Sequence, residues 1–350
     1  MKVSQKIYKA PKKISFNNQN KKKLIGTMGL LLVLVMAASL CIGAYFIDPR
    51  EVFQILRHKL WGVPVPNGMA GTIVWDIRLT RILLAVTVGA ALASSGAVYQ
   101  GIFRNPLIEP YILGVSSGAA FGAALAILFE FPYSLQLLAF FFGMLAVTAT
   151  YSVARMNGET PLVTLILSGV IISSLFSAMV SIFQYIGTEE QLRRLVFWLM
   201  GGLYQATWSD IKTILPVVAV GVLLLWMNAW KLNVLSLGET EAKTLGIHTE
   251  RTKAVLMVTA TAITAISVSL TGIIGWVGLM LPHAARLIVG PDHRFLIPLA
   301  AIMGSIFLVV CDTLARTIST GEVPIGIITA ILGAPYLLFL LRRRSNYMGG

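Results

Sequence analysis

Long apolar segments constrain this sequence more than any other feature. Several of them exceed the ~18 apolar residues that a helix needs to cross a bilayer. Only 12% of the residues are charged, whereas soluble domains carry about a quarter. We therefore predict an all-α polytopic membrane protein. Its nine apolar blocks lie at about 24–47, 82–103, 110–129, 134–154, 161–187, 210–230, 254–290, 295–318 and 323–341.

The number of membrane spans follows from charge and length together. Basic residues crowd both termini, and an excess of Lys and Arg marks cytoplasmic segments. Two cytoplasmic termini require an even number of spans. The block at 254–290 is too long for one ordinary span at about 1.5 Å per residue, and Gly272, Gly275, Gly278 and Pro282 interrupt it. We expect two helices there, which gives ten spans in all.

The chain is predicted to form one membrane domain over 24–343. A basic cytoplasmic tail precedes it at 1–23, and a short cytoplasmic tail follows at 344–350. The net charge of +13 comes largely from these ends, which favours contact with anionic lipid and argues against nucleic acid as a partner. Cys41 and Cys311 lie inside apolar blocks, where a cysteine is typically a small packing residue.

Small residues dominate the stretch 78–119. They let helix backbones approach closely, as packed membrane helices require. We expect this helix to lie inside a bundle. Arg78 and Arg81 at its start are predicted to lie on the extracytoplasmic side of the membrane. The positive-inside bias disfavours basic residues there, so their presence requires an explanation.

A mixed, aromatic-rich segment occupies residues 188–208. We interpret it as an interfacial helix on the outer face, with Trp198 and Trp208 at headgroup level. An ordinary external loop is an equally good interpretation of its first half.

No enzymatic or metal centre is predicted. The four histidines are scattered, and none is spaced with cysteine or carboxylate as metal ligands are. Residues 238–244 lack the second glycine of a phosphate-binding loop. Asp312 lies deep in a span, four residues before Arg316, and this spacing predicts a self-neutralising pair.

The longest cytoplasmic loop, 231–253, contains a short helical pattern. A helix from about Glu239 to Leu245 would place Ala242 and Leu245 on one face, and Gly246 would end it. Such a compact knob suits a groove on a soluble partner. A solvated loop is the alternative, and the residues favour neither.

A series of ordered motifs covers nearly the whole chain after residue 24. The motifs are Arg78-x-x-Arg81, GAALASSGAVYQ at 89–100, RNPL at 104–107, Pro110, LG at 113–114, GA at 118–119, LGETEAKTLGI at 237–247, GIIGWVGLMLPHAARLIVGPDHR at 272–294 and EVPIGIITAILGAPYLLFLLRR at 322–343. Together they resemble one known family, the permease subunits of ABC importers for iron–siderophore complexes, haem and vitamin B12 (the FecCD/BtuC type). Thr80 departs from the family's pattern, which has a proline between the two arginines.

The resemblance implies a BtuC-like type II permease fold and a set of partners. These are a second, identical or related permease chain, two cytoplasmic ATPase subunits and an extracytoplasmic siderophore-binding protein. ATP and Mg would bind to the ATPase, and this chain would bind no cofactor.

The resemblance also implies roles for particular residues. Docking of the binding protein would fall to Arg78, Arg81 and Arg316, and ATPase coupling to Gly238, Glu239, Ala242, Leu245 and Gly246. The pathway and its packing would involve Gly89, Gly96, Gln100, Asn105, Pro106, Gly114 and Gly118.

The expected function is therefore import of a ferric siderophore through a bacterial cell membrane, with haem or cobalamin as alternative substrates. From a different class, an ion-coupled secondary transporter would need charges at the membrane midplane, and Asp312 alone offers little.

Overall fold

The computed structural model describes residues 17–62, 69–131, 134–318 and 323–348. These ranges are almost entirely helical. In chain order the elements are α1 (Asn18–Cys41), α2 (Pro49–Trp61), α3 (Met69–Thr72), the π-helical turn η1 (Ile73–Arg78), α4 (Leu79–Ile102), the 3-10 turn η2 (Pro110–Leu113), α5 (Val115–Leu128), α6 (Leu135–Ala154), α7 (Leu162–Ile186), α8 (Glu189–Leu199), α9 (Trp208–Met227), α10 (Ala229–Leu235), α11 (Glu239–Thr244), α12 (Thr249–Thr271), α13 (Val277–Val289), α14 (His293–Ile318) and α15 (Ile325–Met348).

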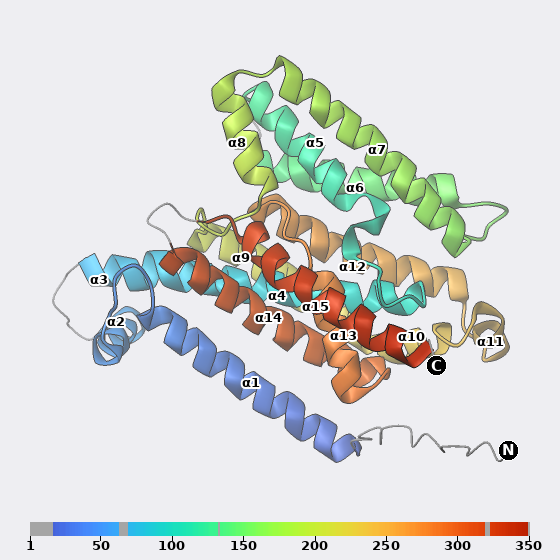
Figure 1. Ribbon diagram of the computed structural model, residues 1–350, viewed down its shortest axis with the longest axis horizontal. Helices are drawn as coiled ribbons and strands as arrows, with labels where there is room; N and C mark the ends of the chain where they lie inside the picture. The colour runs from blue at the N-terminus through green and yellow to red at the C-terminus, as the bar shows by residue number, and fades with distance from the viewer. Residues whose placement is uncertain (1–16, 63–68, 132–133, 319–322, 349–350) are drawn as a thin grey trace, which may run out of the picture.

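Ten helical segments account for the predicted spans. Among the described residues, seven are long and apolar enough to cross a membrane, and three shorter apolar helices, α5, α13 and α15, join them. The long block at 254–290 divides as expected, because α12 ends at Thr271 and α13 begins at Val277. The start of α1 and the end of α15 lie at the same end of the molecule (Figure 1). The ten-span prediction is confirmed.

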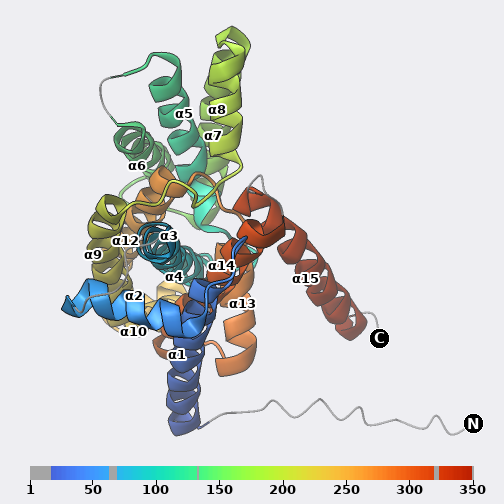
Figure 2. The ribbon, with the colours of Figure 1, turned by 90° about the vertical axis from the view of Figure 1, so that its left-hand side faces the viewer.

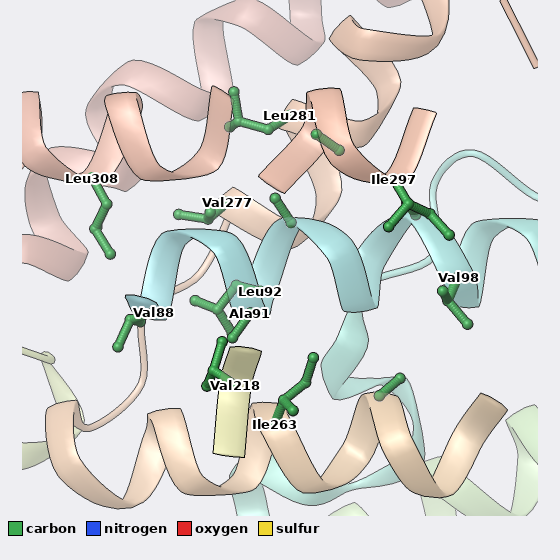
Figure 3. Packing of buried hydrophobic residues seen from close by; sticks show 14 of the residues in the cluster. Val88, Ala91, Leu92, Val98, Val218, Ile263, Val277, Leu281, Ile297 and Leu308 are labelled. Carbon is green, nitrogen blue, oxygen red and sulfur yellow. The ribbon is translucent and has the colours of Figure 1, made fainter. Parts of the chain in front are cut away.

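Helix α4 lies at the centre of the molecule. Figure 2 shows it nearly end-on among its neighbours. It packs against α14, α12, α9 and α13, and nearly all of its residues from Thr80 onward are buried. Figure 3 shows Val88, Leu92 and Val98 of α4 among side chains of these surrounding helices. The expectation of a helix inside a bundle is confirmed.

Glycines set the distance between α4 and two of its neighbours. A Cβ atom on Gly89 would collide with the backbone of Gly304 in α14, and one on Gly96 would collide with the carbonyl oxygen of Gly278 in α13. Lipid chains are as apolar as leucine, so helices in a membrane gain little by hiding apolar area from lipid. Close backbone packing therefore holds this centre together.

A separate group of helices, α5 to α8, forms a lobe on one side of the central layer (Figure 1). Helix α5 packs against α6, α7 and α8. Its Phe121 ring lies 4.8, 5.5 and 5.4 Å from the ring centroids of Phe142, Phe176 and Phe183. Contacts of α5 and α6 with α12 join the lobe to the centre.

The segment 188–208 is helical in its first half only. Thr188 and Gln191 form a reciprocal capping box that starts α8. Residues 200–207 form a connection, and Trp208 begins α9 with its ring 4.9 Å from that of Trp75. The expected helix is confirmed over Glu189–Leu199 but not over residues 200–207, and its placement at a membrane surface stays a prediction.

Candidate functional site

Two ends of the molecule carry the residues that the sequence marks as functional. At the outer end, Asp312 of α14 lies between two guanidinium groups. Its Oδ1 accepts hydrogen bonds from Arg81 Nε at 3.1 Å and Nη2 at 2.8 Å, and its Oδ2 lies 3.0 Å from Arg316 Nε. The predicted pair of Asp312 with Arg316 is confirmed. The third member, Arg81, lies 231 positions away in sequence and was not foreseen as a partner.

Arg78 lies beside this cluster and serves a helix end. It donates through Nη1 to the carbonyl oxygens of Leu40 at 2.7 Å and Cys41 at 3.0 Å, and through Nη2 to that of Tyr45. The last carbonyls of a helix have no partner within the helix, and its C-terminus attracts cations. Arg78 therefore fastens α1 to the segment that leads into α4.

The three arginines that the resemblance assigns to docking are buried. Arg78 and Arg81 are 3% exposed and Arg316 is 7% exposed, whereas a docking residue has to reach the surface. The unpaired carbonyls of α1 and the carboxylate of Asp312 draw the guanidinium groups inward. In this chain the arginines connect α1, α4 and α14, and their docking role stays a prediction.

At the opposite end, α11 projects from the bundle (Figure 1). It spans Glu239–Thr244, and Gly246 follows it with a φ of +76°, which favours glycine. The expected shared face differs in the structure: Ala242 is fully buried against the protein, whereas Leu245 is 59% exposed. The helix ends before Leu245, so that side chain no longer follows the face of Ala242. Leu245 is thus available to a partner and Ala242 is not.

A buried lysine connects this helix to its surroundings. Lys253 Nζ lies 3.0 Å from Glu239 Oε1 of α11 and 2.5 Å from Glu250 Oε1 of α12, and it donates to the Thr160 carbonyl oxygen at 3.1 Å. Glu250 Oε2 in turn accepts from the Thr160 hydroxyl at 2.6 Å. Lys253 thereby joins α11, α12 and the connection between α6 and α7. The i,i+3 spacing of Glu250 and Lys253 was visible in the sequence, but their contact with Thr160 was not.

A second ion pair reinforces this junction at the surface. Lys243 Nζ of α11 lies 2.8 Å from Glu159 Oε1. The hydrogen bond between them lowers the pKa of Glu159 and raises the pKa of Lys243. Both side chains are largely exposed, so solvent screens the pair and it adds little stability.

Helix α10 is attached to the start of α14 by a polar joint. Asn233 Nδ2 donates to Asp292 Oδ1 at 2.8 Å, and Asn233 Oδ1 accepts from the His293 backbone amide at 2.8 Å. Burial tends to raise the pKa of Asp292, but hydrogen bonds from Arg294 and Asn233 outweigh it and hold the pKa at about 2. The cytoplasmic loop is thus tied to the central layer at two places.

Three of the residues expected at the pathway, Gly89, Gly96 and Gln100, are buried in α4. Gln100 is fully buried, donates to the Leu279 carbonyl oxygen at 3.0 Å, and accepts from Arg286 at 3.2 Å. With Gly89 and Gly96 it packs α4 against α13 and α14. The expected packing role of these residues is therefore seen in the structure, and a role in lining the pathway stays a prediction.

The other four expected residues lie beyond α4. Asn105 is exposed at the cytoplasmic end, where its Oδ1 accepts from the Leu107 amide at 3.0 Å, and Pro106 follows it. Gly114 separates η2 from α5. A Cβ on Gly118 would collide with the Phe142 carbonyl oxygen of α6, so this glycine packs the lobe.

Comparison with known proteins assigns the chain to a family. The model of the FecCD transport family matches residues 30–343. The chain belongs to this family. It is a permease subunit of an ABC importer and a multi-pass membrane protein, with a localisation consistent with the bacterial inner membrane.

Relatives and a solved structure agree on this role but carry different substrate names. The chain is 49% identical to a cobalamin import permease, BtuC of Halobacterium salinarum, over 81% of this chain and 76% of that protein. It is 41% identical to the molybdate import permease MolB of Haemophilus influenzae, over 92% and 96%. A structure described as an inward-facing metal-chelate type ABC transporter is 38% identical, with a TM-score of 0.82 over 92% and 99%.

These findings support a transport role for the chain. Among the residues that the structure describes, no group of three or more His, Cys, Asp or Glu residues could hold a metal ion. The two ends described above are candidate contacts with the partners of such a transporter.

Proposed function

We propose that this permease moves a ferric siderophore into the cytoplasm. Two permease chains would enclose the pathway, two ATPase subunits would bind at the α11 end, and an extracytoplasmic binding protein would deliver the chelate at the other. Two observations support contact of α11 with an ATPase. Leu245 is exposed, and Lys253 anchors α11 to the membrane spans through Glu239. Such an anchor is needed because a docked helix transmits motion only when it is attached to the spans.

One observation carries the substrate proposal. A hollow of about 720 Å³, which we call the outer cavity, lies at the end of the molecule opposite α11. Its volume falls within the range of sites that hold sizeable ligands. A metal chelate of siderophore size suits it better than a bare ion, and the similarity to a metal-chelate type transporter agrees with this. Lining residues include Gln136, Arg193, Arg194, Trp198, Tyr204 and Gln205.

Uptake of radiolabelled ferric siderophores tests the proposal. A strain that lacks this gene and all related permeases is compared with the same strain carrying the gene on a plasmid. We expect uptake of one chelate class to be lost and then restored. Unchanged uptake of every ferric chelate would contradict the proposal.

Cobalamin is a second candidate, favoured by the 49% identity to a cobalamin import permease. Labelled cobalamin in the same two strains separates the candidates. Loss of cobalamin uptake with normal iron uptake would replace the siderophore proposal and leave the permease role intact.

A further inference from the structure

The outer cavity contains a feature that substrate size does not explain. It lies where the outer ends of α5, α6, α8, α12 and α15 meet, and α8 contributes two adjacent arginines, Arg193 and Arg194. Both guanidinium-bearing side chains are exposed, unlike those of the cluster around Asp312. The walls of the cavity thus present two positive charges to whatever enters.

These charges are not neutralised within the described part of the chain. Neither arginine forms a hydrogen bond or an ion pair there, and none of the described lining residues is acidic. Glu189 and Glu190 precede the arginines by one turn of α8, but no oxygen of either lies within 4.0 Å of a guanidinium nitrogen. The described residues that line the cavity therefore carry two positive charges and no negative charge.

The surrounding side chains are suited to a large ligand with oxygen donors. Phe197, Trp198 and Tyr204 contribute aromatic faces, and Gln136 and Gln205 add neutral hydrogen-bonding groups. A guanidinium group can bind the oxygens of a carboxylate or a catecholate through two parallel hydrogen bonds. Arginine on the outer side of a membrane protein also runs against the positive-inside bias, so a binding role explains its presence.

We infer that the outer cavity is a receiving site for a negatively charged metal chelate and that Arg193 and Arg194 select it over a neutral chelate of similar size. This inference rests on the proposed function, since it names the charge class of the substrate. The arginines would supply attraction and orientation to a ligand that enters this cavity.

Equilibrium binding to the full-length permease in lipid nanodiscs tests the inference without the binding protein or the ATPase. The probes are an iron-55 tris-catecholate complex, which is trianionic, and a neutral iron-55 trihydroxamate complex. The variants are the double change Arg193→Gln with Arg194→Gln, its Lys–Lys counterpart, and Arg57→Gln. Arg57 is an exposed arginine on α2 that does not line the cavity.

We expect the double Gln variant to bind the anionic complex ~10-fold more weakly or worse, and the neutral complex within about two-fold of the parent. The Lys–Lys variant should recover part of the loss, and Arg57→Gln should change neither affinity. Equal weakening of both complexes, unchanged binding of the anionic complex, or no saturable binding of it by the parent would each overturn the inference.

The outcome is separable from that of the proposed function. Saturable binding that depends on the two arginines, in a protein whose gene supports no siderophore uptake, would retain the anion site and reject the ferric substrate. Uptake of a ferric siderophore that is insensitive to the double Gln change, together with unchanged binding, would retain the importer and reject the site. Since no binding protein is present in the nanodisc assay, a role of Arg193 and Arg194 in docking it cannot imitate the expected result.

Discussion

Replacing Asp312 with alanine is the change whose effect follows most directly from the structure. The carboxylate is fully buried and lies between Arg81 and Arg316, which are themselves almost entirely buried. Its removal leaves two guanidinium groups without their shared counter-charge. The three residues connect α4 and α14, so the loss acts on the packing of the central layer.

The size of the effect can be estimated from comparable buried pairs. Breaking one by removing a partner costs about 3–5 kcal/mol, because the remaining charge stays desolvated. Asp312 serves two partners, so we place Asp312→Ala at the upper part of that range. For a protein of this size, such a loss corresponds to a lowering of the unfolding midpoint by roughly 5–10 °C.

Thermal unfolding of the purified permease in detergent measures this loss. Cys311 is buried next to Asp312, so a thiol-reactive dye reports its exposure on unfolding, in a Cys41→Ala background that removes the other thiol. The triple change Arg81→Met, Asp312→Leu and Arg316→Met is the control, because apolar replacement of a whole buried ion cluster is often neutral.

An unfolding midpoint of Asp312→Ala equal to that of the parent would refute the role of Asp312 in holding α4 and α14 together. The same triple variant also tests docking. If it folds normally and still captures the binding protein, Arg81 and Arg316 are structural only. If it folds but captures none, the arginines also contact that partner.

Three further predictions concern other parts of the molecule. Gly96→Val should cost about 1–3 kcal/mol, measured by the same unfolding assay, whereas Gly29→Val, with open space around its Cβ, should cost little. Lys253→Met should reduce ATP-driven uptake by reconstituted transporter more than ATP hydrolysis, because α11 loses its anchor, and Arg251→Met should not. The pKa of Asp292 is about 2, below its usual 3.8, so its contribution to stability is complete above pH 3.8 and fades toward pH 2. The midpoints of the parent and Asp292→Asn should therefore converge over that interval, and a constant difference would contradict this.

Helix number and topology were predictable because the backbone N–H and C=O groups of each span have to form hydrogen bonds within that span when it lies in lipid. This constraint leaves a long apolar signal in the sequence for most spans. Charge parity then resolved the block at 254–290 into α12 and α13. The small residues of α4 likewise indicated a central helix, since only close packing needs them.

The side-chain geometry was predictable only where partners lie close in sequence. The pair of Asp312 with Arg316 is separated by one helical turn, and the structure confirms it. Arg81 and Thr160 reach partners that are 231 and 93 positions away, and no local pattern encodes such a contact. The burial of Arg78 was not predictable, because its sequence neighbourhood does not reveal the carbonyls of α1 to which it donates.

The enclosure of α4 has a consequence for how members of this family change their cargo. Nearly all side chains of α4 from Thr80 onward are buried among other helices of the same chain. Its glycine contacts tolerate almost no added atom, which ties the architecture to a fixed set of small residues. We therefore expect differences in cargo between relatives to arise at exposed walls, such as those of the outer cavity, and not in α4. This agrees with the similarity of the chain both to a permease named for cobalamin and to one named for molybdate.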